Sequence, residues 1–275
     1  MKPFLNWAGG KRWLAGNYSE YFQSKDERLI EPFVGSGAVF FARKPQSAIL
    51  SDSNARLIET YRAVRDDYEK VLHHLKIHDA NHCKEYYYSL RKRNCTKPYT
   101  RAAQFIYLNR TCFNGLYRVN QNGVFNVPIG TKKNVIQFDD DFQSWSNALK
   151  DTCLYVQDFE QTILMAEKGD FIYADPPYTV RHNNNGFLKY NERIFSWNDQ
   201  ERLASVLKET KEKGIKILVS NADHESIRSL YENDGWIIDR VKRFSGIAAA
   251  SNNRKGITEI IIRNFELDEN ANAKE

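Results

Sequence analysis

Asp170-Phe171-Ile172-Tyr173-Ala174-Asp175-Pro176-Pro177-Tyr178 is the most informative stretch of this 275-residue chain. Its first five residues predict a short buried strand, and its last four place a carboxylate, two prolines and an aromatic ring directly after that strand. Ligands of an open α/β sheet bind at the carboxyl ends of the strands. The prolines stiffen the loop and have no N–H group to donate. The stretch therefore predicts a binding loop at the end of a central strand.

The side chains of Asp175 and Tyr178 suit the alkylation of an amine that is attached to an aromatic base. Such an amine is a poor nucleophile because its lone pair is delocalised into the ring. A carboxylate and a backbone carbonyl that accept its two hydrogens would localise the lone pair, and a stacked ring would hold the base flat. The alternative is a surface turn with a buried tyrosine, and the tetrapeptide alone favours neither interpretation.

Composition narrows the class of protein. The net charge of +5 is mildly basic, which is compatible with binding nucleic acid. No apolar stretch is long enough to span a bilayer and the N-terminus has no apolar signal core, so we expect a cytoplasmic protein. The four cysteines have no paired CxxC spacing, so we expect reduced thiols and neither a zinc site nor a disulfide framework.

Patterns typical of strands and of helices alternate along most of the chain. Strands are expected at 28–33, 47–51, 154–157, 170–174, 215–220, 236–241 and 257–264. Helices are expected from residue 36 and over 54–82, 160–167, 199–213 and 224–233, with Gly214 as a C-cap. Strands separated by helices predict an α/β fold with a mostly parallel sheet and an antiparallel hairpin at the C-terminal end.

Residues 56–145 contain a stretch without this alternation that is rich in Tyr, Asn, Arg and Lys. We interpret them as an insert with a separate task, mostly helical and with a β-hairpin at the turn signal Asn114-Gly115. The expected domains are therefore residues 1–55 together with 146–275, which would bind the cofactor and carry out catalysis, and the insert at 56–145.

Gly35 and Gly37 lie in the loop Glu31-Pro32-Phe33-Val34-Gly35-Ser36-Gly37, between the first expected strand and its helix. Glycines at a helix N-terminus let the backbone approach a ligand closely. Asp52 ends the next strand, at about the spacing where an acid reaches ribose hydroxyls in dinucleotide-binding folds. The loop lacks the GxGxxG spacing that a nicotinamide cofactor favours. The prediction is therefore a different cofactor that contains a nucleoside.

Five motifs occur in order: Trp7-Ala8-Gly9-Gly10-Lys11, residues 31–37, Asn114-Gly115-Leu116-Tyr117-Arg118, Phe125-Asn126-Val127-Pro128 and Asp175-Pro176-Pro177-Tyr178. With these motifs the chain resembles the Dam-type DNA adenine methyltransferases and related restriction–modification enzymes over nearly its whole length. The resemblance implies a Rossmann-like methyltransferase domain that uses S-adenosylmethionine, and a target-recognition domain at 56–145. The implied reaction methylates the N6 amine of adenine in double-stranded DNA, at GATC, and releases S-adenosylhomocysteine.

The resemblance also implies the site residues. The expected cofactor residues are Trp7, Lys11, Phe33, Gly35, Gly37, Asp52, Asp158, Phe159 and Asp175. The expected catalytic residues are Asp175, Pro176, Pro177 and Tyr178, without a metal. Lys11 would pair with a carboxylate, Asp52 would hold the ribose, and Asp158 would flank the adenine of the cofactor. The alternatives are a core position for Trp7 and a helix N-cap for Asp158.

Asp175 cannot reach an adenine that is stacked inside a duplex. The base must rotate out of the stack into a pocket, at a cost of about a few kcal/mol. Tyr178 is the ring expected to receive it, since stacking on an aromatic side chain is worth roughly 1–3 kcal/mol per base.

The insert and the N-terminus would contact DNA. The residues implied are Asn6, Arg91, Arg93, Phe113, Asn114, Leu116, Arg118, Asn120 and Pro128. The basic run around Arg91 predicts phosphate contacts and a salt-dependent affinity, with a solvated helix face as the alternative. Arg118 would bind a guanine through two hydrogen bonds, and Leu116 would open a base step. A tight hairpin with packed aromatic rings is the alternative for this segment.

Phe113 or Asn114 would fill the gap that the flipped adenine leaves in the base stack. Asn6 departs from the family pattern, which often has lysine before Trp7, so the preference for a flanking base is expected to differ. Residues 179–186 and 252–256 are further candidates, the first for closing over the base and both for phosphate contacts. An ordinary loop is the alternative for the first.

Two signals are set aside. His74, His78 and His82 share one helix face at a spacing that can bind zinc, but no fourth ligand converges on that face. Cys112 has no histidine near it in sequence, and methylation of an exocyclic amine needs no covalent adduct with the base.

Two other functions remain open at this point. One is methylation of the cytosine amine or of RNA, although cytosine-amine enzymes usually carry serine in place of Asp175. The other is a DNA-binding protein that has lost its activity. Such a protein would be expected to have lost Gly35, Asp52 or Asp175, and all three are present. The partner expected is double-stranded DNA, without a membrane. A partner restriction enzyme, a monomeric or weakly dimeric state and a bacterial or phage-infected host are further expectations.

Overall fold

The computed structural model describes residues 1–22, 27–120, 123–180, 195–232, 234–243 and 257–267. The chain forms two compact units. The first contains Met1–Arg12, Val34–Lys44 and Asp52–Val156, and the second contains Trp13–Phe33, Pro45–Ser51 and Gln157–Glu275. The functional division expected from the sequence, 1–55 with 146–275 against 56–145, stays a prediction.

Seven strands form one sheet. They are β1 (Leu29–Glu31), β2 (Ala48–Asp52), β3 (Thr152–Val156), β4 (Phe171–Ala174), β5 (Lys216–Ala222), β6 (Ile237–Arg243) and β7 (Ile257–Arg263). Their order is β3-β2-β1-β4-β5-β7-β6. The pairs among β2, β1, β4 and β5 are parallel, whereas β7 is antiparallel to both β5 and β6. The mostly parallel sheet with a C-terminal antiparallel hairpin is confirmed.

The central strands are buried on both faces. Ile30 lies beside Ile49 on one side and beside Ile172 on the other, and Ile172 lies beside Ile217. All four isoleucines are buried. A parallel strand that is covered on both faces reads as a continuous apolar run, which is why these strands could be located from the sequence.

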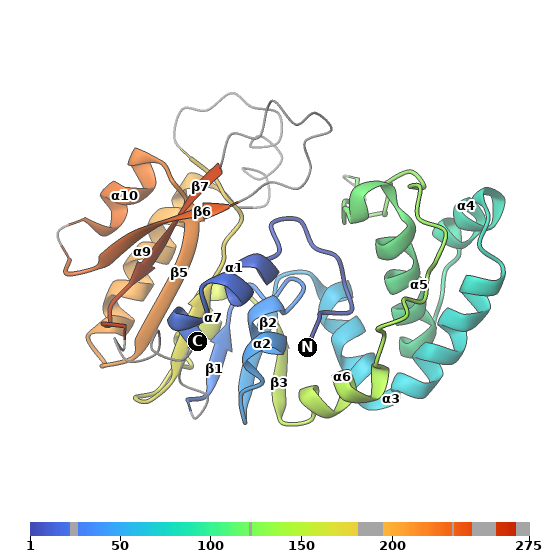
Figure 1. Ribbon diagram of the computed structural model, residues 1–275, viewed down its shortest axis with the longest axis horizontal. Helices are drawn as coiled ribbons and strands as arrows, with labels where there is room; N and C mark the ends of the chain where they lie inside the picture. The colour runs from blue at the N-terminus through green and yellow to red at the C-terminus, as the bar shows by residue number, and fades with distance from the viewer. Residues whose placement is uncertain (23–26, 121–122, 181–194, 233, 244–256, 268–275) are drawn as a thin grey trace. The chain divides into compact units, whose positions relative to one another are not determined.

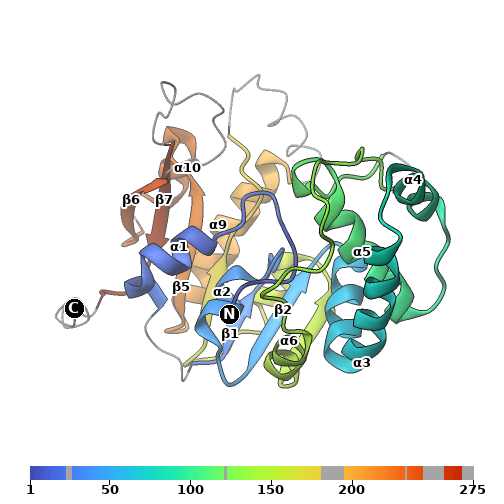
Figure 2. The same ribbon diagram turned by 45° about the vertical axis from the view of Figure 1, so that its right-hand side comes forward.

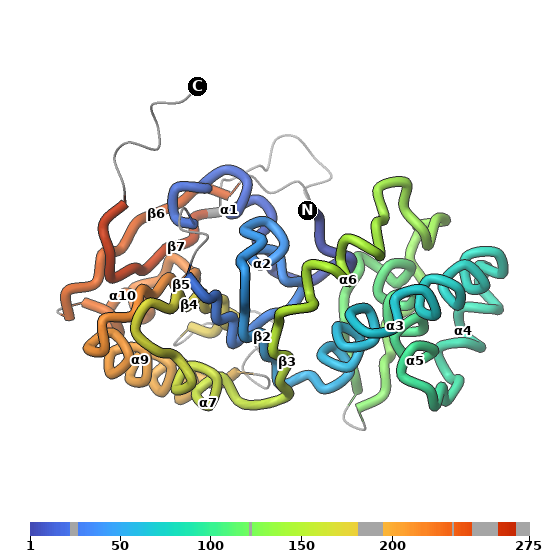
Figure 3. Tube along the Cα trace, turned by 90° about the horizontal axis from the view of Figure 1, so that it is seen from below, coloured from blue at the N-terminus to red at the C-terminus, as the bar shows by residue number. Residues whose placement is uncertain are grey.

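Helices cover both faces of the sheet in the second unit. They are α1 (Arg12–Asn17), the 3-10 helix η1 (Ser19–Phe22), α7 (Phe159–Ile163), α9 (Trp197–Lys211) and α10 (Glu225–Tyr231). Helices α7 and α9 pack together on one face and α1 lies on the other (Figures 1 and 3). Ser196 and Asp199 form a capping box at the start of α9, and Gly214 follows its end with a φ of 74°.

The first unit is mainly helical (Figure 2). Its helices are α2 (Ala38–Arg43), α3 (Ala55–Ala80), α4 (Lys84–Lys92), α5 (Pro98–Thr111), the 3-10 helix η2 (Phe113–Gly115) and α6 (Phe142–Leu149). Helix α3 packs against α5 and α6, and it is interrupted at Asp67, whose φ is −138°. Helix α2 begins two residues after the predicted start because Gly37 has a left-handed φ of 66°, which an α-helix cannot contain.

The hairpin predicted around Asn114-Gly115 is a different structure. The two residues lie in η2 with φ angles of 54° and 63°, so the turn signal located a tight left-handed turn. The chain before it is the end of α5, where the Cys112 N–H still donates to the Leu108 carbonyl. Because no strand precedes the turn, residues 112–129 form only isolated bridges, at Cys112–Ile129 and Val119–Phe125, within the described part of the insert.

Candidate active site

Asp175 follows β4 directly and is held by a side chain from the neighbouring strand. Tyr173 lies beside Leu218 and Ala174 beside Val219, so the next pair of positions is Asp175 and Ser220. The Ser220 hydroxyl donates to Asp175 Oδ1 at 2.7 Å and is 2.9 Å from the Tyr173 hydroxyl. Asp175 is half-buried, and both hydroxyl-bearing partners are buried. The carboxylate is therefore oriented before any ligand binds.

Tyr178 is fixed by a buried acid on β7. Its hydroxyl donates to Glu259 Oε2 at 2.7 Å, and the other Glu259 oxygen lies 3.3 Å from an Arg243 nitrogen. Burial, followed by the nearby Asp175 carboxylate, raises the pKa of Tyr178 well above its usual range, and the same two causes raise the pKa of Tyr173. Both phenols therefore stay protonated and can act as donors at neutral pH.

The backbone between Asp175 and Tyr178 is also held by a side chain of α9, which belongs to the same unit. The Pro177 carbonyl accepts a hydrogen bond from Gln200 Nε2 at 3.3 Å. Gln200 is buried, and its side-chain oxygen accepts from Asn221 Nδ2 at 3.0 Å. Buried polar groups that are all hydrogen-bonded define one geometry for a loop.

Asp158 caps α7 and also binds an arginine on α9. Its Oδ1 accepts from the Glu160 N–H at 2.9 Å, as an N-cap does. Its two oxygens accept two hydrogen bonds from Arg202, at 3.0 and 2.9 Å. The Arg202 guanidinium lies 4.3 Å from the Phe159 ring centroid. Because the Arg202 side chain is 40% exposed, the ion pair adds little stability and serves mainly to orient Asp158.

Three aromatic rings form a cluster next to this ion pair. Phe159 stacks on Phe33 with centroids 5.4 Å apart and packs against Phe195 at 5.5 Å. Phe159 and Phe195 are buried, whereas Phe33 is partly exposed. Phe33 therefore offers the accessible ring surface of the cluster, while Phe159 supports it from behind.

The glycine loop and Asp52 are joined within the first unit. Asp52 accepts from the Gly35 N–H at 3.3 Å and from the Asn54 N–H at 2.9 Å. Withdrawal from water raises the pKa of Asp52 to about 6, although these two N–H groups act in the opposite direction. Gly35 has a φ of 46°, and a Cβ atom there would lie 2.7 Å from the Trp7 ring. Only glycine fits this position.

Lys11 and Gly37 complete this group. Lys11 is buried and its ammonium donates to the Gly9 carbonyl at 2.9 Å. A Cβ atom at Gly37 would lie 2.8 Å from the Tyr61 hydroxyl. The first unit thus holds Trp7, Lys11, Gly35, Gly37 and Asp52, whereas Phe33, Asp158, Phe159 and Asp175 belong to the second.

The turn after α5 presents several of the predicted DNA contacts. Phe113 is 52% exposed, Asn114 and Arg118 are exposed, and Leu116 is half-buried. Arg118 Nε donates to Asn126 Oδ1 at 3.0 Å. Val124 is 53% exposed close to the Val119–Phe125 bridge, and no sequence signal had identified it.

The other predicted DNA contacts are held by the insert itself. Asn120 accepts from the Val124 N–H at 3.0 Å, and the Pro128 carbonyl accepts from Phe113 at 2.9 Å. Arg91 donates to the Val127 carbonyl at 3.0 Å and lies over the Tyr88 ring. Arg93 is exposed. Arg91 therefore has a structural task that sequence reasoning missed.

Residues 7–245 match the D12 class N6 adenine-specific DNA methyltransferase family. The chain belongs to this family. It is 35% identical over 274 residues to the type II methyltransferase M1.LlaDCHI of Lactococcus lactis subsp. cremoris, covering 96% of each chain. It is 36% identical over 267 residues to a DNA adenine methylase of Haemophilus influenzae, covering 94% of this chain and 92% of the relative.

An archaeal relative shows a similar agreement. The type II methyltransferase M.MjaIII of Methanocaldococcus jannaschii is 35% identical over 290 residues, covering 96% of this chain and 99% of the relative. The protein is thus an adenine-specific DNA methyltransferase, and DNA is its substrate. None of the helices in the described ranges is long and apolar enough to cross a membrane.

The histidine stripe of this methyltransferase connects helices. His78 Nδ1 lies 2.8 Å from the Tyr86 hydroxyl and His82 Nδ1 lies 2.7 Å from that of Tyr107, while His74 stacks on Tyr99. Burial lowers the pKa of His78 to about 4, so this ring is neutral. In the part of the chain that the structure describes, no cluster of His, Cys, Asp or Glu has the arrangement of a metal site.

Cys112 and the two loop predictions have different outcomes. The Cys112 thiol is buried, and burial raises its pKa to about 11, so it is not a thiolate at neutral pH. Thr179 is buried and donates to the Phe195 carbonyl at 2.7 Å. Residues 181–186 and 252–256, predicted to approach DNA, lie outside the described residues.

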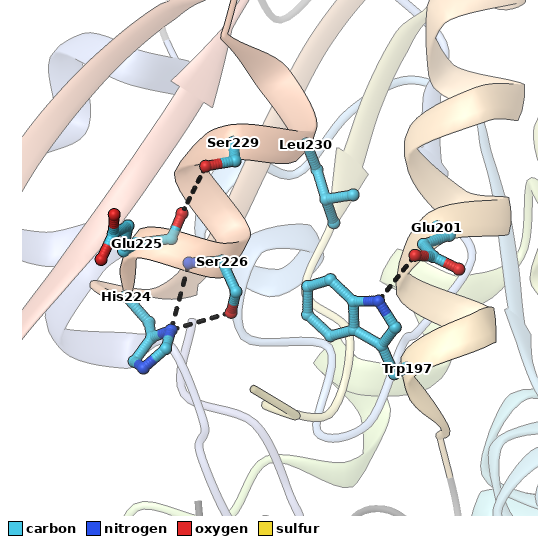
Figure 4. A pocket seen from close by; sticks show the side chains of 7 residues that line it. All are labelled: Trp197, Glu201, His224, Glu225, Ser226, Ser229 and Leu230. Carbon is cyan, nitrogen blue, oxygen red and sulfur yellow. Dashed lines mark hydrogen bonds between the residues drawn. The ribbon is translucent and has the colours of Figure 1, made fainter. Parts of the chain in front are cut away.

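An open groove of about 420 Å³ lies between the start of α9 and α10 (Figure 4). It is lined by Trp197, Glu201, His224, Glu225, Ser226, Ser229 and Leu230. Trp197 donates to Glu201 at 2.7 Å, and His224 Nδ1 accepts from the Ser226 N–H. None of the predicted site residues lines the groove, so we do not assign it to methyl transfer.

Proposed function

We propose that this methyltransferase transfers a methyl group from S-adenosylmethionine to the N6 amine of adenine in double-stranded DNA, at GATC, after the base has left the helix. The observation that carries the proposal is the Asp175 carboxylate at the end of β4, oriented by Ser220 and followed by a rigid loop that ends in an anchored Tyr178. An oriented acceptor beside an aromatic ring is what a poorly nucleophilic aromatic amine requires.

Asp175 acts on the amine in two ways. Its carboxylate accepts one N–H hydrogen bond and so turns the nitrogen lone pair out of conjugation with the ring. As the N–C bond forms and the bond between the methyl group and the donor sulfur breaks, S-adenosylhomocysteine would be the leaving group. The nitrogen becomes more acidic, and Asp175 stabilises the positive charge that develops on it. A proton then leaves the nitrogen, to Asp175 or to water, and the neutral methylamine remains. A positioned group of this kind contributes about 10²–10⁴-fold to a rate.

The residues of the first unit fit a cofactor that contains a nucleoside. The Gly35 backbone has space only for a hydrogen where a side chain would be, and the partly buried Asp52 can accept hydrogen bonds from ribose hydroxyls. When bound, S-adenosylmethionine supplies an electrophilic methyl group on a positively charged sulfur. Trp7, Lys11, Gly35, Gly37 and Asp52, all in the first unit, are the residues proposed to hold it. The cofactor roles of Phe33, Asp158 and Phe159 stay predictions.

Tyr178 is suited to hold an extruded base. Its hydroxyl is bound to Glu259, so little side-chain freedom is lost when a base stacks on the ring. Stacking worth about 1–3 kcal/mol offsets much of the cost of unstacking, which is about a few kcal/mol. Arg118 and Leu116 on the exposed turn are the proposed contacts to neighbouring bases. A partner restriction enzyme and the oligomeric state stay predictions.

Transfer of tritiated methyl groups from S-adenosylmethionine tests this function. The acceptors are a duplex with one GATC, duplexes in which one base pair of GATC is replaced, and a duplex whose target adenines already carry N6-methyl groups. We expect label in the first duplex and at least about fivefold less in those with a replaced base pair, since one wrong base pair costs about 1–3 kcal/mol. The methylated duplex should take up little label because its target amines are already occupied. Equal label in all unmethylated duplexes would refute the proposed GATC specificity but not methyl transfer to DNA. No label in any duplex would refute the proposed reaction.

The pKa of Asp52 gives the cofactor affinity a predictable pH dependence. The free carboxyl has a pKa of about 6, and hydrogen bonds from ribose hydroxyls would lower that pKa in the complex. The affinity for S-adenosylhomocysteine should therefore be constant above pH 6 and fall by up to about tenfold per pH unit below it. Isothermal titration between pH 5 and 8 measures this.

Asp52→Asn is the matched control, because its amide does not titrate. It should bind the nucleoside product more weakly, and its affinity should lose the dependence below pH 6. An unchanged pH profile in this variant would show that another group is responsible.

A further inference from the structure

Trp7 lies between the proposed DNA-binding turn and the glycine loop, all within the first unit. Its ring stacks on Tyr117 with centroids 5.6 Å apart and planes inclined by 16°. On the glycine-loop side, a Cβ atom built on Gly35 would lie 2.7 Å from Trp7 Cδ1 and 3.0 Å from its Nε1. The indole is thus in direct contact with the backbone of one element and with an aromatic ring of the other.

Asn109 fastens the residue before Trp7 to the same turn. Its side chain accepts from the Asn6 N–H and donates to the Asn6 carbonyl, both at 2.8 Å, and a further bond reaches the Gly115 carbonyl at 3.4 Å. Asn109 is 1% exposed, so these bonds are protected from water. A Cβ atom on Gly115 would lie 2.8 Å from that of Asn6, so only glycine lets the turn pass this close to the segment.

The glycine loop continues these contacts to the proposed ribose site. The Gly35 N–H donates to Asp52 at 3.3 Å, and its carbonyl accepts from the Tyr61 hydroxyl at 3.1 Å. A change in the position of Trp7 therefore acts on the same peptide unit that binds Asp52. Packed interiors transmit such displacements because they contain little free space.

We propose that Trp7 and Tyr117 are a positioning pair that couples DNA binding to cofactor binding, an inference that rests on the proposed function. DNA that holds residues 113–118 fixes the Tyr117 ring, which fixes Trp7 against Gly35 and removes part of the ordering cost of cofactor binding. Coupling of this kind is reciprocal: the cofactor must strengthen DNA binding by the same factor. Tyr117 also packs on Phe105 and Phe125, which keep its ring oriented.

The test measures the affinity for S-adenosylhomocysteine by calorimetry, with and without a GATC duplex, and compares this affinity among four proteins. They are the wild type, Tyr117→Leu, the rescue variant Tyr117→Phe and the control Tyr99→Leu, which removes a ring of the same unit that stacks on His74. We expect the duplex to strengthen binding about tenfold in the wild type, within the usual range of coupling. Tyr117→Phe and Tyr99→Leu should keep this factor, and Tyr117→Leu should reduce it to less than about threefold.

Hydrogen exchange gives a second measurement that needs neither cofactor nor turnover. In the wild type, the duplex should slow the exchange of the backbone amides of residues 34–37. In Tyr117→Leu the duplex should not slow it, and the melting temperature of this variant should equal that of the wild type. A wild type without coupling, or a Tyr117→Leu variant that keeps both effects, would overturn the inference. Because a wild type that couples without transferring methyl groups refutes only the proposed function, the two failures are distinguishable.

Discussion

Asp175→Asn is expected to lower the turnover number at least about a thousandfold, near the upper part of the range for a positioned acid or base. The amide has the shape of the carboxylate but no negative charge, so it cannot stabilise the positive charge that develops on the nitrogen. Its NH₂ group would also oppose the amine hydrogens. Single-turnover transfer of labelled methyl groups to a GATC duplex measures the chemical step directly.

Two further variants define what Asp175→Asn tests. Ser220→Ala removes the hydrogen bond to Asp175 Oδ1 but keeps the charge, so we expect a smaller loss of roughly 10- to 150-fold, as a hydrogen bond to a charged group is worth about 1.5–3 kcal/mol. Asp139→Asn changes an exposed carboxylate that binds Lys2 and should leave the rate unchanged. Asp175→Asn must still bind the duplex and S-adenosylhomocysteine. Turnover at the wild-type rate would refute the assigned role of Asp175.

Arg118→Ala should have the largest effect on target choice. Arg118 is exposed on the turn after α5, and only its Nε is engaged by Asn126 among the contacts described, so its terminal nitrogens can form the paired hydrogen bonds that guanine accepts. Loss of one such pair costs about 1–3 kcal/mol, so preference for guanine at one position should fall roughly 5–150-fold. The measurement is kcat/KM on GATC and on duplexes changed at each position.

Arg93→Ala is the matched control for this experiment. Arg93 is an exposed arginine of the same insert, and a phosphate contact from it would weaken binding to all duplexes alike and lower the dependence of affinity on salt. Arg118→Ala should instead change one position of the target and leave the others. If the ranking of the changed duplexes is the same in Arg118→Ala and the wild type, Arg118 does not recognise a base.

The sheet could be predicted because its strands carry their own signal. Buried parallel strands are continuous apolar runs, and the predicted and observed strands agree to within about two residues, as such runs usually allow. The hairpin predicted at Asn114-Gly115 was wrong, because these residues lie in η2 directly after α5. The turn signal is local, whereas the strands beside it depend on whether the preceding helix has already ended, and α5 continues to Thr111.

The residues that hold the candidate site were the least predictable part. Ser220, Glu259 and Arg202 are far in sequence from Asp175, Tyr178 and Asp158, and nothing in their neighbours marks them as partners. Ser220 had one usable signal: it is a polar residue at the end of a strand predicted to be parallel to the one before Asp175. Glu259 and Arg202 had none, because their positions depend on strand order and helix packing.

Local chemistry alone therefore specified the alternation of strands and helices, the glycine loop and the acid that follows β4. These features depend on residues within a few positions of one another, so their pattern survives in the linear chain. Tertiary packing decided which hydroxyl orients Asp175, which acid holds Tyr178 and which ring lies on Trp7. Those contacts join segments separated by 45 to 110 positions, and only the folded sheet and helix pairs bring such segments within hydrogen-bond or stacking distance.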